Sequence, residues 1–587
     1  MKSASLVLSL FFLLIACSSQ EKVADRPPNI VIILADDQGW GDLSMNGNPV
    51  VETPNIDRLA QAGLTFDRFY VHPVCSPTRA ALLTGRYAVR GGVYSTSAGG
   101  ERLDLDETTF AELLRDAGYR TGAFGKWHNG MQAPYHPNAR GFEDFYGYCS
   151  GHWGSYFDAT LEHNGQIIES EGYLTDVLTE RAMGFIQTHR EEPFLVYLPL
   201  NTPHSPMQVP DLWWAKFANL EIPAHRYQER EEPHHTRAAL AMAENIDWNV
   251  GRITAKLAEL DLAENTLLLY FSDNGPNGWR WNGGMEGRKG STDEGGVRSP
   301  LILNWPEKVK KSRTISVITW VGDLFPTLLE FAGVAHQGEK PLDGTSLKPL
   351  IMNEEVDWPD RLIFNHWGNR TSVRSQRFRL DHQNQLFDMY QDPGQTVNVE
   401  ANFPAIANRL KNAKTEWEET VLTELPTEDT RPFPVGHPDF VYTQLPARDG
   451  IARGTIQRSN RWPNCSFYTH WTSSSDSISW EVEVLADGNF EAILYYTCRE
   501  EDAGVVMAFT AGTESVSIPI EEGYDPPLRG MEHDRVLRQE SYVKDFKALS
   551  MGTIRLHQGM TTLSLKALDI PGQQAIDFRL LQLKRLD

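Results

Sequence analysis

Strand-like and helix-like segments alternate along the first half of the chain, and this alternation limits the fold more than any other feature. The run NIVIILADDQ at 29–38 is apolar almost throughout, as expected of a strand that is buried on both faces. The segment TPNIDRLAQAG that follows begins with Thr53 as a helix N-cap and ends with Gly63 as a stop. The alternation continues along the chain. Segments 108–128 and 248–275 each read as a helix that leads into a strand, and 193–204 reads as a strand. Such alternation predicts an α/β fold with a mostly parallel sheet flanked by helices.

Polar side chains follow the carboxyl ends of these predicted strands. They are Asp36, Asp37, Lys126, His128, His204, Asp273 and Asn274. Ligands of open α/β sheets bind at the edge where the strands end. These seven residues are therefore the first candidates for a functional site.

The pattern of the chain changes twice after this α/β region, which we expect to span residues 28–335. Short strand-like segments with one helix at 336–430 predict a small antiparallel α+β subdomain. From 431 to 587, alternating apolar and polar residues predict an accessory β-sandwich. Its aromatic residues fit either a carbohydrate-binding surface or, more simply, a sandwich core. They include Trp462, Trp471, Trp480, Tyr495 and Tyr496.

The N-terminus has the layout of a secretory signal, with Lys2 before the apolar run from Leu6 to Ile15. The sequence LIAC at 14–17 resembles the lipobox of bacterial lipoproteins, so we expect a signal at 1–17, a lipid anchor at Cys17 and a linker at 18–27. An ordinary signal peptide is the alternative. Export to the periplasm or the cell surface would permit disulfides, and Cys465 and Cys498 could pair. The formal net charge of −23 argues against nucleic acid as a partner.

A lone cysteine, Cys75, stands in HPVCSPTRAALLTGRY at 72–87, directly before a predicted helix. Ser76 is a possible N-cap for this helix and Pro77 suits its first turn. A helix N-terminus favours an anion, and Arg79 adds an oxyanion clamp one turn later. From these residues alone, Cys75 could also be a thiolate nucleophile with a lowered pKa.

The sequence CSPTR at 75–79 resembles the signature of the formylglycine-dependent sulfatases, which have an alkaline-phosphatase-like fold. The resemblance extends, in the order of the family, over ADDQGWGD, TPNIDRLAQAGLTF, GKWHNG, TPHSP, SDNG and RKGSTDEGGVRSP. It covers roughly residues 27–430. It implies that a maturation enzyme oxidises Cys75 to a formylglycine aldehyde.

The resemblance also assigns roles to the polar residues at the strand ends. Asp36, Asp37, Asp273 and Asn274, together with modified Cys75, would bind a divalent cation. Because these are hard oxygen donors, Ca²⁺ is the expected ion and Mg²⁺ the alternative. Arg79, Lys126, His128, His204 and Lys289 match the sulfate-binding and proton-transfer positions.

The family resemblance implies a reaction on the hydrated aldehyde of residue 75. One hydroxyl, activated by the metal and Asp273, attacks sulfur, while His204 with Lys289 assists the departing sugar oxygen. His128 then takes the proton of the second hydroxyl, which expels sulfate and restores the aldehyde.

Two aromatic segments are candidates for substrate binding. In 147–165, His152, Trp153 and Tyr156 could contact a sugar, although a packed aromatic loop is an equal alternative. In 277–288, Arg280 and its neighbours Trp279 and Trp281 could line the leaving-group side.

The sequence is therefore interpreted as a sulfatase that acts on a sulfated polysaccharide or oligosaccharide. A phosphodiester or phosphonate monoester hydrolase with the same aldehyde is one rival hypothesis. A glycan-binding surface lipoprotein without turnover is the other, and the intact motif residues argue against it.

Overall fold

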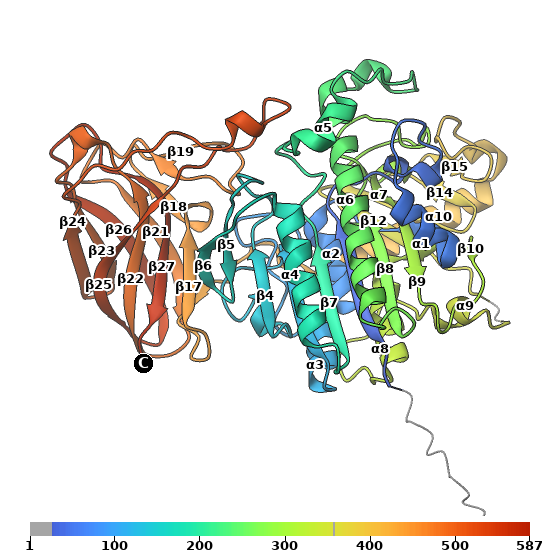
Figure 1. The fold of residues 1–587 in the computed structure, drawn as a ribbon, viewed down its shortest axis with the longest axis horizontal. Coiled ribbons are helices and arrows are strands. Elements are labelled where there is room, and N and C mark those ends of the chain that lie inside the picture. The colour runs from blue at the N-terminus through green and yellow to red at the C-terminus, as the bar shows by residue number, and fades with distance from the viewer. Residues whose placement is uncertain (1–25, 356–357) are drawn as a thin grey trace, which may run out of the picture.

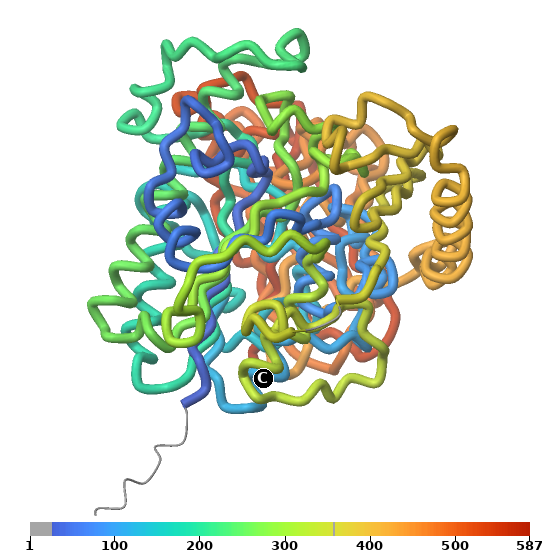
Figure 2. The backbone as a smooth tube through the Cα atoms, turned by 90° about the vertical axis from the view of Figure 1, so that its right-hand side faces the viewer, coloured from blue at the N-terminus to red at the C-terminus, as the bar shows by residue number. Residues whose placement is uncertain are grey.

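The computed structural model describes residues 26–355 and 358–587, which form three parts along the chain (Figure 1). The predicted signal and the lipobox with Cys17 lie outside the described residues. A large α/β part forms one end of the molecule, and a β-sandwich forms the other end. Seen from the side in Figure 2, the α/β part faces the viewer, the sandwich lies behind it, and a small subdomain lies at its edge. No helix within the described ranges is long and apolar enough to cross a membrane.

The α/β part is built on an 11-stranded sheet with the order β10-β2-β9-β8-β1-β7-β3-β4-β5-β6, in which β11 also pairs with β2. The central strands β8, β1, β7, β3 and β4 are parallel, and β9, β5 and β6 add antiparallel pairs. The fold predicted from the alternating segments is thus confirmed. The strands are β1 (Asn29–Ala35), β2 (Leu64–Tyr70), β3 (Arg120–Lys126), β4 (Asp144–Tyr148), β5 (Thr160–His163), β6 (Gln166–Glu169), β7 (Phe194–Pro199), β8 (Thr266–Ser272), β9 (Arg298–Asn304), β10 (Arg313–Ile315) and β11 (Thr319–Trp320).

Helices cover both faces of this sheet, and β1 shows how one strand contributes to both layers. Val31 and Ile33 pack on the face that carries α1, α4 and α6, and the last two lie in front of the sheet in Figure 1. Ile32 and Leu34 pack on the opposite face with α2, α3 and α8. The helices are α1 (Pro54–Ala62), α2 (Cys75–Thr84), α3 (Phe110–Asp116), α4 (Leu174–Thr188), α5 (Asp211–Phe217), α6 (Pro233–Glu259), α7 (Glu294–Val297), α8 (Leu324–Ala332) and α9 (Lys348–Met352).

The small subdomain is a four-stranded antiparallel sheet with the helix α10 (Pro404–Thr420) packed against it. A buried carboxylate joins it to the α/β part. Glu294 accepts hydrogen bonds from Tyr70 of β2 (2.9 Å) and from Arg379 of β14 (3.0 Å). The strands are β12 (Ile363–Trp367), β13 (Arg370–Arg374), β14 (Phe378–Leu380) and β15 (Leu386–Asp388).

Two six-stranded sheets form the C-terminal β-sandwich. Trp471, Trp480 and Tyr496 fill its core, which favours the simpler of the two interpretations for these aromatic residues, whereas Trp462 remains 46% exposed. One sheet contains β16 (Phe433–Val435), β21 (Ser477–Val484), β26 (Gly559–Asp569), β23 (Val506–Ala511), β24 (Glu514–Pro519) and β18 (Ile451–Arg453). The other contains β19 (Gln457–Arg458), β20 (Tyr468–Thr469), β27 (Asp577–Arg585), β22 (Gly488–Thr497), β25 (Lys547–Leu556) and β17 (Tyr442–Pro446).

The possible disulfide between Cys465 and Cys498 is wrong. All four cysteines of the described residues are free and buried. The thiol of Cys465 donates a hydrogen bond to the carbonyl of His152 (2.8 Å), whereas Cys498 lies at the end of β22, 3.6 Å from the carbonyl of Ala575. The two thiols serve different contacts, one at the boundary with the α/β part and one inside the sandwich.

Candidate active site

The site forms where two neighbouring parallel strands end. Ala35 of β1 is in register with Ser272 of β8, so the residues that follow each strand meet. The backbone N–H of Asp37 donates to Oδ1 of Asp273 (3.2 Å), and Nδ2 of Asn274 donates to Oδ1 of Asp37 (2.8 Å). All four of the predicted strand-end ligands are fully buried.

Cys75 lies beside these carboxylates as the first residue of α2. Val74, with an extended backbone, is the N-cap, so the prediction that Ser76 caps the helix is wrong by two positions. Thr78 supplies a contact that the sequence did not predict. Its hydroxyl donates to the carbonyl of Asp273 (2.6 Å) and accepts from the backbone N–H of His72 (2.9 Å). Thr78 thus holds the start of α2 against the end of β8.

Three cations pair with the three carboxylates around Cys75. Arg79 donates to Oδ2 of Asp273 (2.7 Å), Lys126 donates to Oδ2 of Asp36 (2.8 Å), and Lys289 lies 2.7 Å from Oδ1 of Asp37. Buried charges are stable only when they are paired in this way. Motif residues far apart in the sequence therefore form one charge-balanced cluster.

Burial and these pairings shift the pKa values of two neighbouring carboxyl groups, Asp36 and Asp37, in opposite directions. Burial raises the pKa of Asp36 to about 8, with Asp273 and Asp37 adding to the effect and Lys126 opposing it. Burial acts in the same sense on Asp37, but Lys289, His204 and Asn274 hold its pKa below the ordinary value. Carboxylates that are crowded together in a dry site favour a bound cation.

The donor set fits a hard divalent cation. Within the described part of the chain, Oδ1 of Asp36 and Oδ1 of Asn274 are buried without a hydrogen-bond partner. Ligand atoms of Asp36, Cys75 and Asp273 lie within 4.8 Å of one another, as do those of Asp36, Asp37 and His204. Oxygen donors of this kind suit Ca²⁺ or Mg²⁺.

His128 is held with one ring nitrogen in a hydrogen bond and the other without a partner. Its Nε2 lies 2.8 Å from the carbonyl of Thr96, which can only accept, so Nε2 carries the proton and Nδ1 has a free lone pair. Burial lowers the pKa of His128 well below its ordinary value, and Lys126 adds to this. His128 (φ 70°) and Asp37 (φ 68°) both have left-handed backbones, a conformation that is uncommon in residues other than glycine. Backbone strain of this kind is typical of functional sites.

His204 lies near Asp37 and Lys289. Its Nδ1 is 2.6 Å from the carbonyl of Ser205, and its Nε2 is 3.7 Å from Oδ2 of Asp37. Burial and Lys289 lower the pKa of His204 to about 4, although Asp37 opposes them. Tyr156 supports the loop by donating from its hydroxyl to the carbonyls of His204 and Ser205, each at 3.1 Å.

Of the predicted sugar-binding residues, His152 lies beside His204. Its ring stacks on His204 with centroids 5.9 Å apart. Arg280 donates to Asp42 (2.6 Å) and to the carbonyl of Asp37 (2.8 Å), so its guanidinium supports the loop that carries Asp37. Trp279, beside it in the sequence, packs on Tyr227 with ring centroids 5.0 Å apart.

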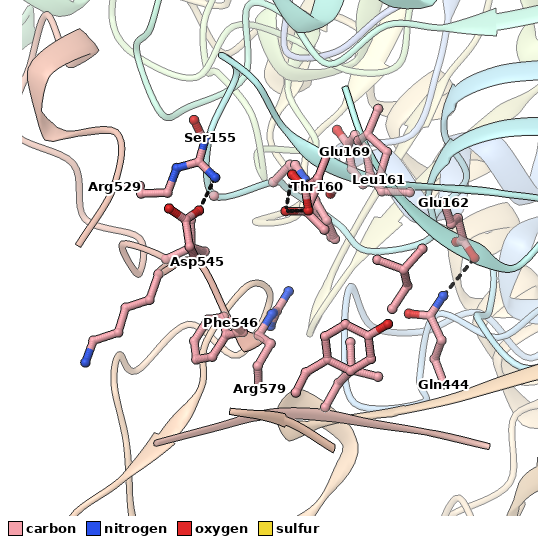
Figure 3. Close-up of a pocket in the computed structure, with 18 of the residues that line it drawn as sticks. Ser155, Thr160, Leu161, Glu162, Glu169, Gln444, Arg529, Asp545, Phe546 and Arg579 are labelled. Carbon is pink, nitrogen blue, oxygen red and sulfur yellow. Dashed lines mark hydrogen bonds and ion pairs between the residues drawn. The ribbon is translucent and has the colours of Figure 1, made fainter. Parts of the chain in front are cut away.

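Trp153 lines a cavity of about 420 Å³ between the α/β part and the sandwich, part of whose lining is drawn in Figure 3. Its ring stacks on Tyr148 and its indole N–H donates to the carbonyl of Thr160 (2.8 Å). Across this cavity Arg529 forms an ion pair with Asp545, as Figure 3 shows. Trp153 therefore belongs to the contact between the two parts.

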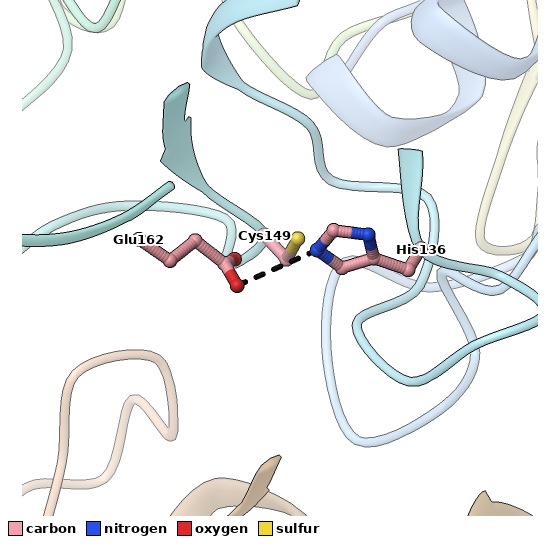
Figure 4. A group of neighbouring side chains, drawn as sticks. All are labelled: His136, Cys149 and Glu162. Carbon is pink, nitrogen blue, oxygen red and sulfur yellow. Dashed lines mark hydrogen bonds and ion pairs between the residues drawn. The ribbon is translucent and has the colours of Figure 1, made fainter. Parts of the chain in front are cut away.

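A second group beside this cavity, His136, Cys149 and Glu162, resembles a metal site but is an internal hydrogen-bond group (Figure 4). Nδ1 of His136 accepts from the backbone N–H of Asn138 (3.3 Å), so its Nε2 carries a proton toward Glu162 (3.4 Å). Burial and Glu162 raise the pKa of the Cys149 thiol well above its ordinary value. Neither nitrogen nor sulfur is therefore free to bind a cation.

Sandwich residues that the sequence does not predict also reach segments beside the histidines. Asn464 donates to the carbonyl of Thr96 (3.4 Å), the same carbonyl that orients His128. Arg448 pairs with Glu101 of the adjacent segment (2.7 Å). These contacts join residues more than 340 positions apart, and no local pattern in the sequence indicates them.

Comparison with known proteins agrees with this geometry. Residues 28–334 match the family model described as Sulfatase, and residues 289–420 match N-sulphoglucosamine sulphohydrolase, C-terminal. Mouse N-acetylgalactosamine-6-sulfatase is 34% identical over 382 residues, which cover 59% of this chain and 70% of that protein. Rat arylsulfatase G is 33% identical and covers 62% of this chain and 76% of its own.

The solved structure of Ps i-CgsB in complex with k-i-k-neocarrahexaose is similar in fold, with a TM-score of 0.62 and 30% identity. The match covers 69% of this chain and 96% of that one. Both family models end before the β-sandwich begins. The chain belongs to the sulfatase family and is a sulfuric ester hydrolase of the alkaline-phosphatase-like fold.

Proposed function

We propose that this protein hydrolyses sulfate esters of a sulfated polysaccharide or oligosaccharide, through a formylglycine made from Cys75. The observation that carries the proposal is the position of Cys75 at the start of α2, beside Asp36 and Asp273 and among paired cations and carboxylates. A sulfate ester is an anion, and in a protein with a net charge of −23 it needs local positive charge.

Asp36, Asp37, Asp273 and Asn274 would hold the divalent cation, for which Ca²⁺ is our choice and Mg²⁺ the alternative. The hydrated formylglycine supplies a hydroxyl nucleophile together with a second hydroxyl whose loss of a proton releases sulfate. A maturation enzyme that oxidises Cys75 is therefore a required partner.

The other residues of the cluster bind the sulfate group and move protons. Lys126 and Lys289 neutralise charge on the sulfate oxygens, and Arg79 fixes Asp273 beside Cys75. Nδ1 of His128 is free to accept a proton from residue 75. A sulfate ester beside Lys289 offsets the positive charge that lowers the pKa of His204, so that His204 takes up a proton for the departing sugar oxygen.

Carbohydrate is the substrate class that the relatives favour. One is named for N-acetylgalactosamine 6-sulfate, and a similar structure contains a neocarrahexaose. We also propose that the protein is exported to the periplasm or the cell surface and anchored through Cys17, on the basis of its signal-like N-terminus.

The test combines mass and activity. Protein from a host with the maturation enzyme should give a peptide containing residue 75 that is lighter by about 18 Da than the cysteine form, because a thiol is replaced by an aldehyde. The same sample should release sulfate from 4-nitrophenyl sulfate faster than it cleaves an aryl phosphate diester. Preference for the diester, or an unmodified Cys75 in an active enzyme, would contradict the proposal.

A further inference from the structure

The β-sandwich contacts the loop that carries His204 and the segment around Thr96, whose carbonyl orients His128. Ser205, next to His204, donates a hydrogen bond to Glu540. Gln208 of the same loop donates to the carbonyl of Gly530 (2.7 Å). On the other side, Asn464 contacts the Thr96 carbonyl that orients His128. The sandwich therefore forms one wall of the active site, although it lies outside both family models.

Asn464 belongs to a loop at 459–467 that connects β19 to β20. Asn464 is buried, and its Oδ1 accepts from Ser150 (3.1 Å) and from Arg448 (3.3 Å). A Cβ atom added to the neighbouring Gly151 would lie 2.5 Å from Nδ2 of Asn464 and 2.6 Å from Nε2 of His128. A single glycine thus separates this loop from the catalytic histidine.

The same loop exposes an aromatic ring and a cation two and three residues earlier. Trp462 is 46% exposed, and the guanidinium of Arg461 lies 4.8 Å from its ring centroid. An extended chain advances at most about 3.6 Å per residue, so the Cα of Trp462 lies within about 7 Å of that of Asn464. The ring and the cation are therefore carried by the stretch of backbone that leads directly into Asn464 at the active-site wall.

The loop is held in place from within the sandwich. Ser459 shares a hydrogen bond with the hydroxyl of Ser541 (2.7 Å), and Asn460 donates to the carbonyl of Gln539 (2.8 Å). Oδ1 of Asn460 accepts from the backbone N–H of Trp462 (2.9 Å). The indole is thus presented on an ordered backbone, which reduces the entropy lost when a ligand binds.

A second exposed tryptophan that lies beside an arginine differs from Trp462 and Arg461 in its charge pairing. Trp248 on α6 is 42% exposed and lies 4.8 Å from Arg252, but Arg252 also pairs with Glu180. Arg461, in contrast, has no acidic partner among residues 26–355 and 358–587. An unpaired cation beside an exposed indole is suited to an anionic sugar, because the ring stacks on the pyranose and the guanidinium binds its carboxylate or sulfate.

We propose that Trp462 and Arg461 form a subsite for the anionic sugar that neighbours the sulfated unit in the active site. This inference rests on the proposed function, since it names a further contact for the same substrate. The β-sandwich then determines specificity, in that it favours an oligosaccharide over a single sulfated unit.

The test compares two substrates in the matured full-length enzyme. One is a tetrasaccharide of N-acetylgalactosamine 6-sulfate and uronic acid, and the other is 4-nitrophenyl sulfate, which has no neighbouring sugar. Trp462→Ala should lower the ratio of kcat/KM for the tetrasaccharide to that for the aryl sulfate about tenfold. The control Trp248→Ala should leave this ratio unchanged. Equal ratios in both variants would overturn the subsite, and so would a Trp462→Ala protein that unfolds at the wild-type temperature but loses both activities in parallel.

Arg461→Gln tests the charge. It should lower kcat/KM for the tetrasaccharide, relative to that for 4-nitrophenyl sulfate, severalfold. It should not lower this ratio for a tetrasaccharide in which the uronic carboxyl is reduced to an alcohol. An equal loss on both tetrasaccharides would overturn the role of the cation.

Binding of the tetrasaccharide, measured by calorimetry, separates this inference from the proposed function. A protein that binds it in a Trp462-dependent way but releases no sulfate would contradict the proposed function and leave the subsite standing. A protein that hydrolyses 4-nitrophenyl sulfate but does not bind the tetrasaccharide would overturn the subsite alone.

Discussion

The strand-end cluster of the α/β part and the core of the β-sandwich bury different kinds of side chains. At the strand ends of the α/β part, Asp36, Asp37, Arg79, Lys126 and Asp273 are all fully buried within one cluster. The core of the sandwich is filled instead by large apolar side chains such as Trp471 and Trp480. Because buried charge is costly and buried apolar surface is favourable, the first region gives up stability for reactivity and the second supplies stability.

The two regions also contribute to the site through different parts of their folds. The cluster acts through the buried ends of its strands, whereas the sandwich reaches the site only through loops such as 459–467. Changes in the cluster should therefore affect turnover, and changes in the sandwich core should affect folding. Four predictions test this division.

The largest expected effect is on turnover. Cys75→Ala removes the proposed precursor of the nucleophile and should lower kcat by about 10⁴-fold or more, as loss of a covalent nucleophile does in other hydrolases. Sulfate release from 4-nitrophenyl sulfate measures this loss, and thermal unfolding checks that the fold survives. Cys498→Ala is the control, because this buried thiol lies in the sandwich. Comparable losses in both variants would contradict the division.

The second effect is on folding. Trp480 is fully buried in the sandwich core, so Trp480→Ala should lower the free energy of unfolding by about 3–5 kcal/mol, as large-to-small changes in cores do. Urea denaturation measures the change. Trp248→Ala, on the exposed face of α6, should cost less than about 1 kcal/mol. A small cost for Trp480→Ala would show that the sandwich does not depend on its aromatic core.

Much of this architecture could be predicted from the sequence because the underlying signals are local. The apolar run before Asp36 and Asp37 indicates a buried strand, and the positions of acids and amides after strands indicate one edge of the sheet. Boundaries were less certain. The sequence indicated only the second half of α6, and it placed the N-cap of α2 at Ser76, because tertiary contacts override local preference there.

The contacts across the sandwich boundary could not be predicted. Asn464 and Arg448 carry no motif, and their partners Thr96 and Glu101 lie in a distant segment. Arg280 shows the opposite error. An arginine in an aromatic segment suggests ligand binding, but only the fold reveals that the guanidinium of Arg280 forms an ion pair with Asp42.

The third prediction concerns pH and the buried carboxylate that joins the α/β part to the small subdomain. Burial would raise the pKa of Glu294, but Arg374 and Arg379 hold it at about 2, below its ordinary value. A pKa that is lower in the folded state gives stability that is fully present above about pH 4.5 and is lost as the pH falls toward 2. At about 1.4 kcal/mol per unit, this contribution amounts to roughly 3 kcal/mol.

Glu294→Gln should therefore reduce the free energy of unfolding at pH 7 and flatten its decline between pH 5 and pH 2. Urea denaturation at several pH values measures both effects. Glu481→Gln, on an exposed position of β21 in the sandwich, serves as the control and should keep the acid dependence of the wild type. If the Glu294→Gln profile runs parallel to that of the wild type, the ion pairs with the subdomain do not contribute.

The smallest expected effect is that of the metal on stability. A cation bound by Asp36, Asp37, Asp273 and Asn274 relieves the repulsion among buried carboxylates, so Ca²⁺ should stabilise the folded protein. At 100 times its dissociation constant it should add about 2.7 kcal/mol, and chelation should remove this gain. Thermal unfolding with and without Ca²⁺ measures the shift. Asp273→Asn should abolish it, whereas Asp381→Asn, in the separate group Asp293, Asp381 and His382, should not. If the stabilisation by Ca²⁺ persists in Asp273→Asn but disappears in Asp381→Asn, the ion binds at Asp381 and not in the buried cluster. The buried carboxylates of the cluster would then serve only to pair with the cations that bind the substrate.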